Sequence, residues 1–323
     1  MGTLVFCTQK LDENDPVLAA TVPKVRALAE RVDELVVLCD AARWEAPPNV
    51  RVRVFGAPTQ IERGARFERA LLRELGGASA VVAHMVPLYA VIAAPFVRAR
   101  RIPLALWYTH WKGHAVVRAA EAVCTHVLSV DVRSFPLRSR KVRGIGHGID
   151  LAEFACSDAP DGRSRALVLG RYSPAKGLET ILRAAELAGV ELEAHGSDQT
   201  FEAYKRTLVE RFPDAGLGGP VPRAELPGLF ARSHVLVNNM RAGAPDKVVY
   251  EAAASCLPVL ASNPVFDDLL PAELRFERDD ADGLASKLRE LDRRRRPELR
   301  EIVARRHSVE HWADEVVATV MGG

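Results

Sequence analysis

The sequence has few cysteines, no long hydrophobic run and almost no excess of charge of either sign. Its five cysteines are widely spaced, form no CxxC pair and cannot all pair with one another, so they favour a reduced, cytoplasmic protein. The longest apolar run, Met85–Val97, is shorter than the roughly 20 residues that a membrane-spanning helix needs. The first residues, MGTLVFCTQKLDEND, have the pattern of neither a signal peptide nor a transit peptide, so we expect no targeting segment there.

The charges are balanced, with 44 Lys and Arg against 42 Asp and Glu and a formal net charge of +2. Nucleic-acid-binding domains are usually strongly basic, so we expect no nucleic-acid partner. Three short basic clusters are interpreted as solvated faces: Arg98–Arg101, Arg138–Arg143 and Arg293–Arg296. The first follows the apolar segment Pro87–Val97, which leaves open a peripheral contact with the anionic inner face of a membrane.

Short apolar runs alternate with amphipathic stretches along almost the whole chain. A length of 323 residues suggests two domains of about 150 residues each. Buried strands that alternate with helices predict parallel sheets covered on both faces, and therefore two doubly wound α/β domains. The segment Gly144–Arg165 has no helical period and is predicted to be the linker. The expected strands are Thr3–Cys7, Glu34–Cys39, Val50–Phe55, Ala78–Ala83, Pro103–Tyr108 and His126–Val130, then Arg165–Gly170, Glu191–Ala194, Leu217–Val221, His234–Asn238 and Pro258–Ala261.

Ligands of open α/β sheets bind beyond the carboxyl ends of the strands, so the polar residues there are the first candidates for a site. In Gly170–Gly177 (GRYSPAKG), a strand ends, a turn follows and a helix opens. Arg171 and Lys176 thus lie beside the free N–H groups of a helix N-terminus, which favours an anion-binding site. The spacing is not that of a Walker A loop. An ordinary surface loop with two solvated cations is the alternative.

A second candidate lies in the segment from Gly243 to Leu260. Here Glu251 falls near the start of a helix rich in small residues. Its carboxylate is either a partner of the helix dipole or an acceptor of hydroxyl hydrogen bonds. If the anion site upstream binds a nucleotide, ribose hydroxyls are its natural targets.

These two segments resemble family-4 glycosyltransferases of GT-B fold. GRYSPAKGLETILRAAELA is similar to the family's GRLxxxKGxxxLLxA segment, and DKVVYEAAASCLPVLAS to its block of Glu, small residues and G-x-P-V. The segment Gly146–Asp150 (GHGID) with Phe154 is similar to the interdomain N-G-V-D…F pattern. The resemblance is close over residues 144–320 and loose over 1–143.

The resemblance implies two Rossmann-like domains that face an interdomain cleft. Residues 1–148 would form the acceptor-side domain, with a C-terminal helix, 308–321, packing back on it. Residues 149–307 would bind the nucleotide sugar.

The resemblance also assigns roles to single residues. Arg171 and Lys176 would bind the diphosphate of the donor and stabilise the leaving nucleoside diphosphate. Glu251 would accept hydrogen bonds from the ribose. The remaining donor-binding residues would be Gly219 and Val221 beside the nucleobase, the backbone N–H groups of Val248 and Val249 near the phosphates, and Lys247.

Some positions depart from the family pattern. The first Glu of the family's E-x7-E pair would fall at position 243, which is glycine here. Sugar contacts and donor choice are therefore open, with Asp246 or Lys247 as partial replacements. Cys256 stands where the family has a glycine after the helix. The glycine-rich loop after the first strand is missing.

His110 follows the strand PLALWYT and matches the strand-end histidine that lies over the transferred sugar in the family. The alternative is a polar residue that only satisfies the end of the strand. For His84, at the end of the preceding strand, a role in the cleft and a structural role are equally consistent. His110 and His114 have the spacing of a metal pair, but no third ligand is near, so we expect no metal.

Taken together, the sequence predicts a retaining, metal-independent glycosyltransferase without a cofactor. Its donor would be a UDP- or GDP-linked sugar, and its acceptor a small molecule, a lipid or a glycan. Two alternatives remain: a catalytically silent nucleotide-sugar-binding relative, which Gly243 makes plausible, and an NAD-dependent oxidoreductase, which the lack of any GxGxxG after a strand disfavours. The nucleobase, the sugar, the acceptor and the oligomeric state stay open.

Overall fold

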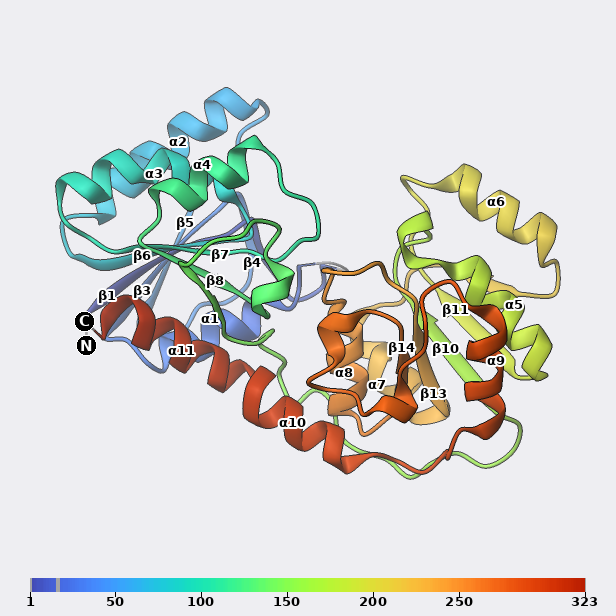
Figure 1. Ribbon diagram of the computed structural model, residues 1–323. Coiled ribbons are helices and arrows are strands. Elements are labelled where there is room, and N and C mark those ends of the chain that lie inside the picture. Colours follow the sequence, from blue (N-terminus) through green and yellow to red (C-terminus); the bar gives the residue numbers. More distant parts are fainter. Residues whose placement is uncertain (1, 16–17, 323) are drawn as a thin grey trace. The chain divides into compact units, whose positions relative to one another are not determined.

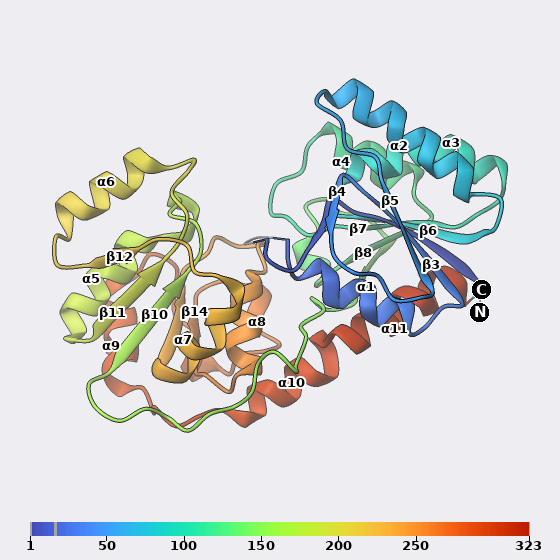
Figure 2. The same cartoon turned by 180° about the vertical axis from the view of Figure 1, so that it is seen from behind.

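The computed structural model describes residues 2–15 and 18–322 (Figure 1). The chain divides into two compact units, one of residues 1–148 with 306–323 and the other of residues 149–305. Each unit is built on a parallel sheet with helices packed on its faces, as the opposite views of Figures 1 and 2 show. The predicted fold class, α/β with two doubly wound Rossmann-like units, is confirmed.

The first unit has a seven-stranded sheet in the order β5-β3-β1-β6-β7-β8-β9. Helices α2, α3 and α4 cover one face, and α1 and α11 the other (Figures 1 and 2). Because neither face meets water, the inner strands are apolar along their length. The strands are β1 (Thr3–Cys7), β3 (Glu34–Cys39), β5 (Val50–Val54), β6 (Ala78–His84), β7 (Leu104–Trp107), β8 (His126–Ser129) and β9 (Val142–Gly144). The helices are α1 (Thr21–Ala29), α2 (Gln60–Glu74), α3 (Pro87–Ala99), α4 (Ala115–Val123) and α11 (Val309–Met321).

Helix α11 supplies a central side chain of this unit, Trp312, which is fully buried. Its ring lies 6.4 Å from that of Phe6 in β1 and 6.2 Å from that of Trp107 in β7, measured between centroids. The ammonium of Lys24 in α1 lies 4.0 Å from the Trp107 ring centroid and 5.0 Å from that of Trp312. Residues from both ends of the sequence therefore form one core.

The apolar run Met85–Val97 mostly forms helix α3. Six residues of α3 are buried, among them Tyr89, Ala90 and Val97, whereas Leu88 is 41% exposed. The run is hydrophobic chiefly because it packs on the sheet. No helix in the described part of the chain is long and apolar enough to cross a bilayer.

The second unit has a five-stranded parallel sheet in the order β12-β11-β10-β13-β14. From the central β10 the chain runs outward to β11 and β12, then crosses over to β13 and β14. The order therefore reverses between β10 and β13, which is where such sheets bind ligands. The strands are β10 (Arg165–Leu169), β11 (Glu191–His195), β12 (Gly216–Gly218), β13 (Val235–Asn238) and β14 (Val259–Ala261). The helices are α5 (Leu178–Ala188), α6 (Glu202–Arg211), α7 (Leu226–Arg232), α8 (Lys247–Ala254) and α9 (Ala281–Glu290), and α10 (Pro297–His307) leads out of the unit.

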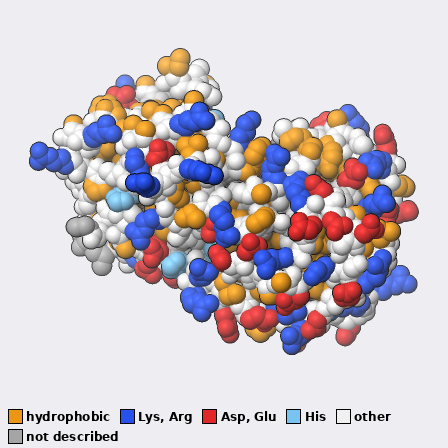
Figure 3. All heavy atoms as spheres, in the orientation of Figure 1, with side chains coloured by type: hydrophobic (Ala, Val, Ile, Leu, Met, Phe, Trp, Pro, Cys, Tyr) orange, Lys and Arg blue, Asp and Glu red, His pale blue; other side chains and the backbone are white. Residues whose placement is uncertain are grey.

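Figure 3 shows acidic and basic side chains interspersed over the visible face of residues 149–305, so no patch of one sign dominates that face.

The expectation of a fully reduced chain is wrong for one pair of cysteines. Cys156 and Cys256 form a disulfide between two segments that lie 100 residues apart in sequence. Their Cα atoms are 5.1 Å apart, because the chain that follows residue 149 packs beside the end of α8. Cys256 adopts a left-handed conformation, with φ of +58°, at the position where the family has a glycine. Cys7, Cys39 and Cys124 are free and buried.

Candidate functional site

The loop after β10 brings Lys176 to the point where the strand order of the second unit reverses. Its ammonium donates a hydrogen bond to the carbonyl of Leu169, the last residue of β10, at 3.2 Å. Gly170 allows the Lys176 side chain to pass this close to the backbone, because a Cβ on residue 170 would lie 2.2 Å from the lysine nitrogen. A φ of +129° at Gly170 also requires glycine. The predicted cation therefore lies at the expected edge of the sheet.

Lys176 is paired with an acid. Its Nζ lies 2.6 Å from Oδ2 of Asp246, the residue that precedes α8. The same oxygen accepts a hydrogen bond of 2.8 Å from Nδ2 of Asn238, the last residue of β13. Lys176, Asn238 and Asp246 thus join the ends of the two strands that flank the switch point.

Arg171, the other predicted cation, lies on the same loop but is exposed to solvent. Within residues 2–15 and 18–322, its guanidinium has no hydrogen bond or ion pair. Of the two predicted cations, one is therefore free to meet an incoming anion and the other must share its charge with Asp246.

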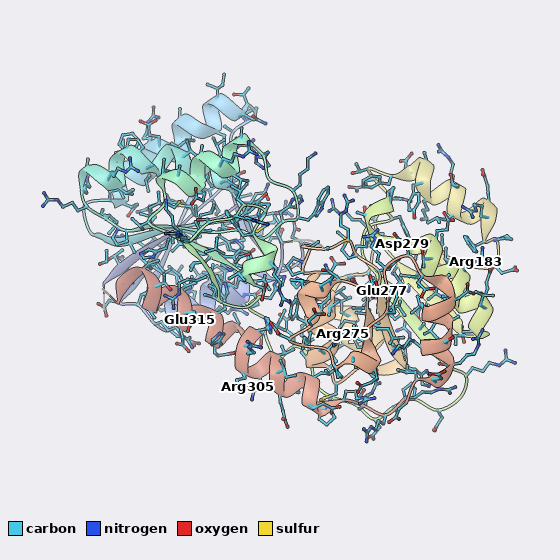
Figure 4. The ribbon with its side chains drawn as sticks, in the orientation of Figure 1. Arg183, Arg275, Glu277, Asp279, Arg305 and Glu315 are labelled. Atoms are coloured by element: carbon cyan, nitrogen blue, oxygen red, sulfur yellow. A yellow bond between two sulfur atoms is a disulfide. The ribbon has the colours of Figure 1, made fainter. Side chains whose placement is uncertain are left out.

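A buried asparagine ties this loop to its neighbours. Nδ2 of Asn239 donates to the carbonyl of Gly177, at 3.2 Å, and to Oδ1 of Asp279, at 3.0 Å. Its Oδ1 accepts a hydrogen bond of 2.8 Å from the hydroxyl of Ser262, beyond β14. Asp279 has a left-handed φ of +61°, and Figure 4 shows it on the segment before α9, together with Arg275 and Glu277. Sequence reasoning missed Asn238 and Asn239, although two amides directly after a buried strand were a usable signal.

Glu251 is buried at the centre of an ion-pair network that the sequence did not predict. Its Oε1 accepts a hydrogen bond of 2.7 Å from Nη1 of Arg223 and lies 3.2 Å from Nζ of Lys247. The second arm of Arg223 pairs with Oε2 of Glu153 at 2.5 Å. Among the described residues, Oε2 of Glu251 accepts no hydrogen bond.

These charges keep Glu251 ionised. Burial by itself raises the pKa of the Glu251 carboxyl, but the charges of Lys247 and Arg223, and their hydrogen bonds, leave that pKa below its ordinary value. Burial lowers the pKa of Lys247, and Glu251 only partly offsets this effect. Glu251 is therefore more than a partner of the helix dipole, because its Oε1 neutralises two cations while its Oε2 is left without a donor in the described part of the chain.

Two further donor-site predictions concern backbone and nucleobase contacts. The N–H of Val249 donates to the carbonyl of Asp246 at 3.1 Å, so that group is not available to a phosphate, contrary to the prediction. Val248 is half-buried in the first turn of α8. Gly219 is exposed and Val221 half-buried, in the loop that leads to Arg223.

Gly243 has a physical reason to be glycine. Its φ is +80°, a conformation that a glutamate adopts only with strain. Its N–H donates to Oδ1 of Asn263, at 3.3 Å, and Nδ2 of Asn263 donates to the carbonyl of Ala244, at 2.8 Å. Asn263 also lines a hollow of about 540 Å³ beyond β14, together with Arg275 and Lys287.

In the first unit, His110 lies three residues beyond the end of β7 and is half-buried. Its Nδ1 lies 2.9 Å from the backbone nitrogen of Lys112 and 3.2 Å from the carbonyl oxygen of the same residue, and its ring stacks on that of Trp111. The backbone of Lys112 can therefore hold Nδ1 in either tautomer, which leaves Nε2 for another partner. In the described part of the chain, no group of three or more His, Cys, Asp or Glu side chains is arranged to hold a metal.

His84 is a core residue. It is 5% exposed, and its ring stacks on that of Trp107 with 4.8 Å between centroids. Its Nδ1 lies 3.2 Å from the hydroxyl of Thr8, and its Nε2 3.5 Å from the ammonium of Lys24. Burial, and secondarily the charge of Lys24, lowers the pKa of His84 well below its ordinary value, so the ring is neutral. The structural interpretation of His84 is therefore the correct one.

Comparison with known proteins places this architecture in context. Residues 171–318 match a family model described as glycosyl transferase-like. A comparison with curated proteins finds no match. Sucrose-phosphate synthase from Thermosynechococcus elongatus is 16% identical, with a TM-score of 0.75 over 99% of this chain and 98% of that one. AviGT4, a glycosyltransferase involved in avilamycin A biosynthesis, is 15% identical, with a TM-score of 0.74 over 100% and 99% of the two chains. UDP-GlcNAc 2-epimerase from Methanocaldococcus jannaschii is 11% identical, with a TM-score of 0.60 over 99% and 100%.

Proposed function

We propose that this protein, which has the GT-B fold and carries a glycosyltransferase-like domain, transfers a sugar from a nucleoside diphosphate to an acceptor with retention of anomeric configuration. The observation that carries the proposal is the position of Lys176 at the switch point between β10 and β13, with Arg171 on the same loop. This is where an open α/β sheet binds its ligand, and the two cations suit a diphosphate. The donor would be linked to UDP or GDP.

In this proposal the protein supplies positive charge where negative charge develops. As the bond between sugar and phosphate breaks, charge accumulates on the departing diphosphate. The guanidinium of Arg171, the ammonium of Lys176 and the N-terminus of α5 would stabilise it, and no metal is needed for that role. No carboxylate is assigned as a nucleophile. A departing phosphate oxygen would instead take the proton of the acceptor hydroxyl on the same face of the sugar.

Other residues would orient the donor. Oε2 of Glu251 would accept a ribose hydroxyl, while Arg223 and Lys247 hold Oε1. Gly219 and Val221 would border the nucleobase. The imidazole of His110 would form a hydrogen bond with a hydroxyl of the transferred sugar through Nε2, in either tautomer.

A nucleotide-sugar-binding protein without transferase activity is a second candidate, favoured by Gly243, where the family's first Glu is missing. The two candidates make different predictions. Incubation with UDP- and GDP-sugars, followed by analysis of all sugar products, separates transfer and hydrolysis from epimerisation and from binding alone. A screen of nucleoside diphosphates by thermal shift should first identify the base. Binding without any conversion of the sugar would favour the second candidate.

Replacing Arg171 with alanine should weaken the binding of UDP or GDP by about tenfold or more, because a charge-assisted hydrogen bond contributes roughly 1.5–3 kcal/mol. Titration calorimetry measures the effect. Arg183→Ala is the matched control, since Arg183 is an exposed arginine on α5 and carries the same charge (Figure 4). The assignment of the diphosphate site is wrong if Arg171→Ala and Lys176→Ala both bind with wild-type affinity.

Transfer should survive chelation. Arg171 and Lys176 provide the charge that a divalent cation supplies to other diphosphate-binding enzymes, and no Asp-x-Asp follows a strand in a suitable donor loop. Initial rates with and without EDTA test this. A rate that disappears in EDTA and returns with Mg²⁺ or Mn²⁺ contradicts the proposal.

Membrane contact by Pro87–Val97 together with Arg98–Arg101 stays a prediction. Leu88, at 41%, is an exposed large apolar residue of this segment. Cosedimentation with anionic vesicles tests it.

A further inference from the structure

We propose that Asp246 is an internal counter-ion of the diphosphate site, which competes with the diphosphate for Lys176 and thereby limits affinity and speeds product release. This inference rests on the proposed function for the identity of the ligand. The competition itself is a property of the anion site and does not depend on sugar transfer.

The geometry places one carboxylate oxygen where a phosphate oxygen would be expected. Oδ2 of Asp246 lies 2.6 Å from Nζ of Lys176 and accepts a hydrogen bond from Nδ2 of Asn238 at 2.8 Å. It thus receives a cation and an amide donor at the switch point between β10 and β13. The side chains of Lys176 and Asp246 are only 14% and 22% exposed, so water screens the pair weakly.

The hydrogen-bonding capacity of Lys176 is nearly used up. An ammonium has three N–H donors. One is directed at the carbonyl of Leu169 and one at Asp246, which leaves a single donor for a ligand. A diphosphate must therefore either share the ammonium with a like-charged carboxylate or displace it, and each course weakens binding.

The pair also has a role in the empty site. Without Asp246, Lys176 would be a largely buried cation with no counter-ion whenever no donor is bound, and such a charge is costly. Asp246 would stabilise the site when no ligand is bound, and it would form its ion pair with Lys176 again when the nucleoside diphosphate dissociates. A site that holds its own anion gives up some affinity and gains faster turnover if product release limits the rate.

The test is the variant Asp246→Asn, which removes the charge and keeps an oxygen for the amide of Asn238. It should bind inorganic pyrophosphate, and UDP or GDP, about tenfold more tightly than wild type, which corresponds to about 1.4 kcal/mol. The dissociation rate should fall accordingly. Asp214→Asn is the matched control, because Asp214 is exposed just before β12, at the opposite end of the strands, and should leave the affinity unchanged.

A double variant ties the effect to the lysine. In a Lys176→Met background, Asp246→Asn should gain little or no affinity, because the two residues act on one interaction. Asp246→Ser, which keeps a hydroxyl near Asn238, serves as a second uncharged variant should Asp246→Asn fold poorly, and it should also bind pyrophosphate more tightly.

The outcomes separate this inference from the proposed function. Equal or weaker pyrophosphate binding by the folded uncharged variants overturns the inference, since Asp246 would then only position Lys176. The same holds if neither wild type nor variants bind pyrophosphate. If Asp246→Asn binds pyrophosphate more tightly while the wild-type protein converts no nucleotide sugar, the inference is supported and the proposed function is rejected.

Discussion

Replacing His110 with alanine is expected to lower the rate of sugar transfer by roughly 10²–10⁴-fold, the range for the loss of a positioned polar group next to the chemistry. Binding of the nucleoside diphosphate should stay close to wild type, because the imidazole is assigned to the sugar and not to the nucleotide. The backbone of Lys112 holds the half-buried ring at Nδ1, which leaves Nε2 for a sugar hydroxyl. Single-turnover rates, with affinity measured in parallel, give both quantities.

His114→Ala is the matched control for this experiment. His114 is exposed, precedes α4 and makes no capping hydrogen bond with its side chain, so its loss should leave transfer unchanged. If the two histidines bound a metal together, both variants would lose activity alike. If His110 served only the end of its strand, His110→Ala would lose stability along with activity. A folded, donor-binding His110→Ala enzyme with near-normal turnover contradicts the assignment.

Replacing Glu251 with glutamine is expected to destabilise the second unit by about 3–5 kcal/mol, the usual cost of removing one partner from a buried ion pair. Glu251 is 2% exposed and neutralises both Arg223 and Lys247. With glutamine there, two half-buried cations, whose side chains are 16% and 28% exposed, would share Glu153 alone. A ribose-binding role alone would predict no such loss of stability in the free protein, whereas the ion-pair network does.

The measurement must report on the correct unit. All four tryptophans, at positions 44, 107, 111 and 312, lie in the unit of residues 1–148 and 306–323, so their fluorescence does not follow the unit of Glu251. Hydrogen exchange of the α8 amides does. Glu153→Gln is the control, with an expected loss under about 1 kcal/mol, because that carboxylate is 32% exposed. A Glu251→Gln protein as stable as Glu153→Gln contradicts this account.

The same network has a pH dependence with a definite sign. Because the pKa of Glu251 in the folded protein lies below its ordinary value of 4.5, its contribution to stability is present above that pH. The contribution is lost as the pH falls through the lower, folded-state pKa.

The sequence predicts the strands and the two site loops because each leaves a local signal. The run RALVLG ends at a glycine and is followed by Arg171 and Lys176 before a helical pattern, and all of these lie within a dozen residues. Three-residue strands such as β9 escape prediction because their pattern is too short to distinguish from a loop.

The partners of the site residues leave no such signal. Lys176 meets Asp246 across 70 residues, and Glu251 meets Arg223 across 28. Cys156 reaches Cys256 across 100. The packing of elements that are distant in sequence brings these side chains together: the pairing of β10 with β13 for Lys176 and Asp246, and the packing of α8 beside the chain after residue 149 for the two cysteines. Residue types at the end of a strand can therefore be predicted, whereas the charge left available to a ligand depends on tertiary contacts.

The place of Trp312 in the core of the first unit determines the order in which the protein can be completed on the ribosome. Residues 149–305 form one continuous stretch and can finish folding as soon as they have emerged. The unit that contains β1 must wait, because the ring that packs against Phe6 and Trp107 is synthesised after the whole of the other unit. Until α11 arrives, apolar surface around Phe6, His84 and Trp107 stays uncovered. The part of the chain made first is thus the part exposed longest to chaperones and to aggregation.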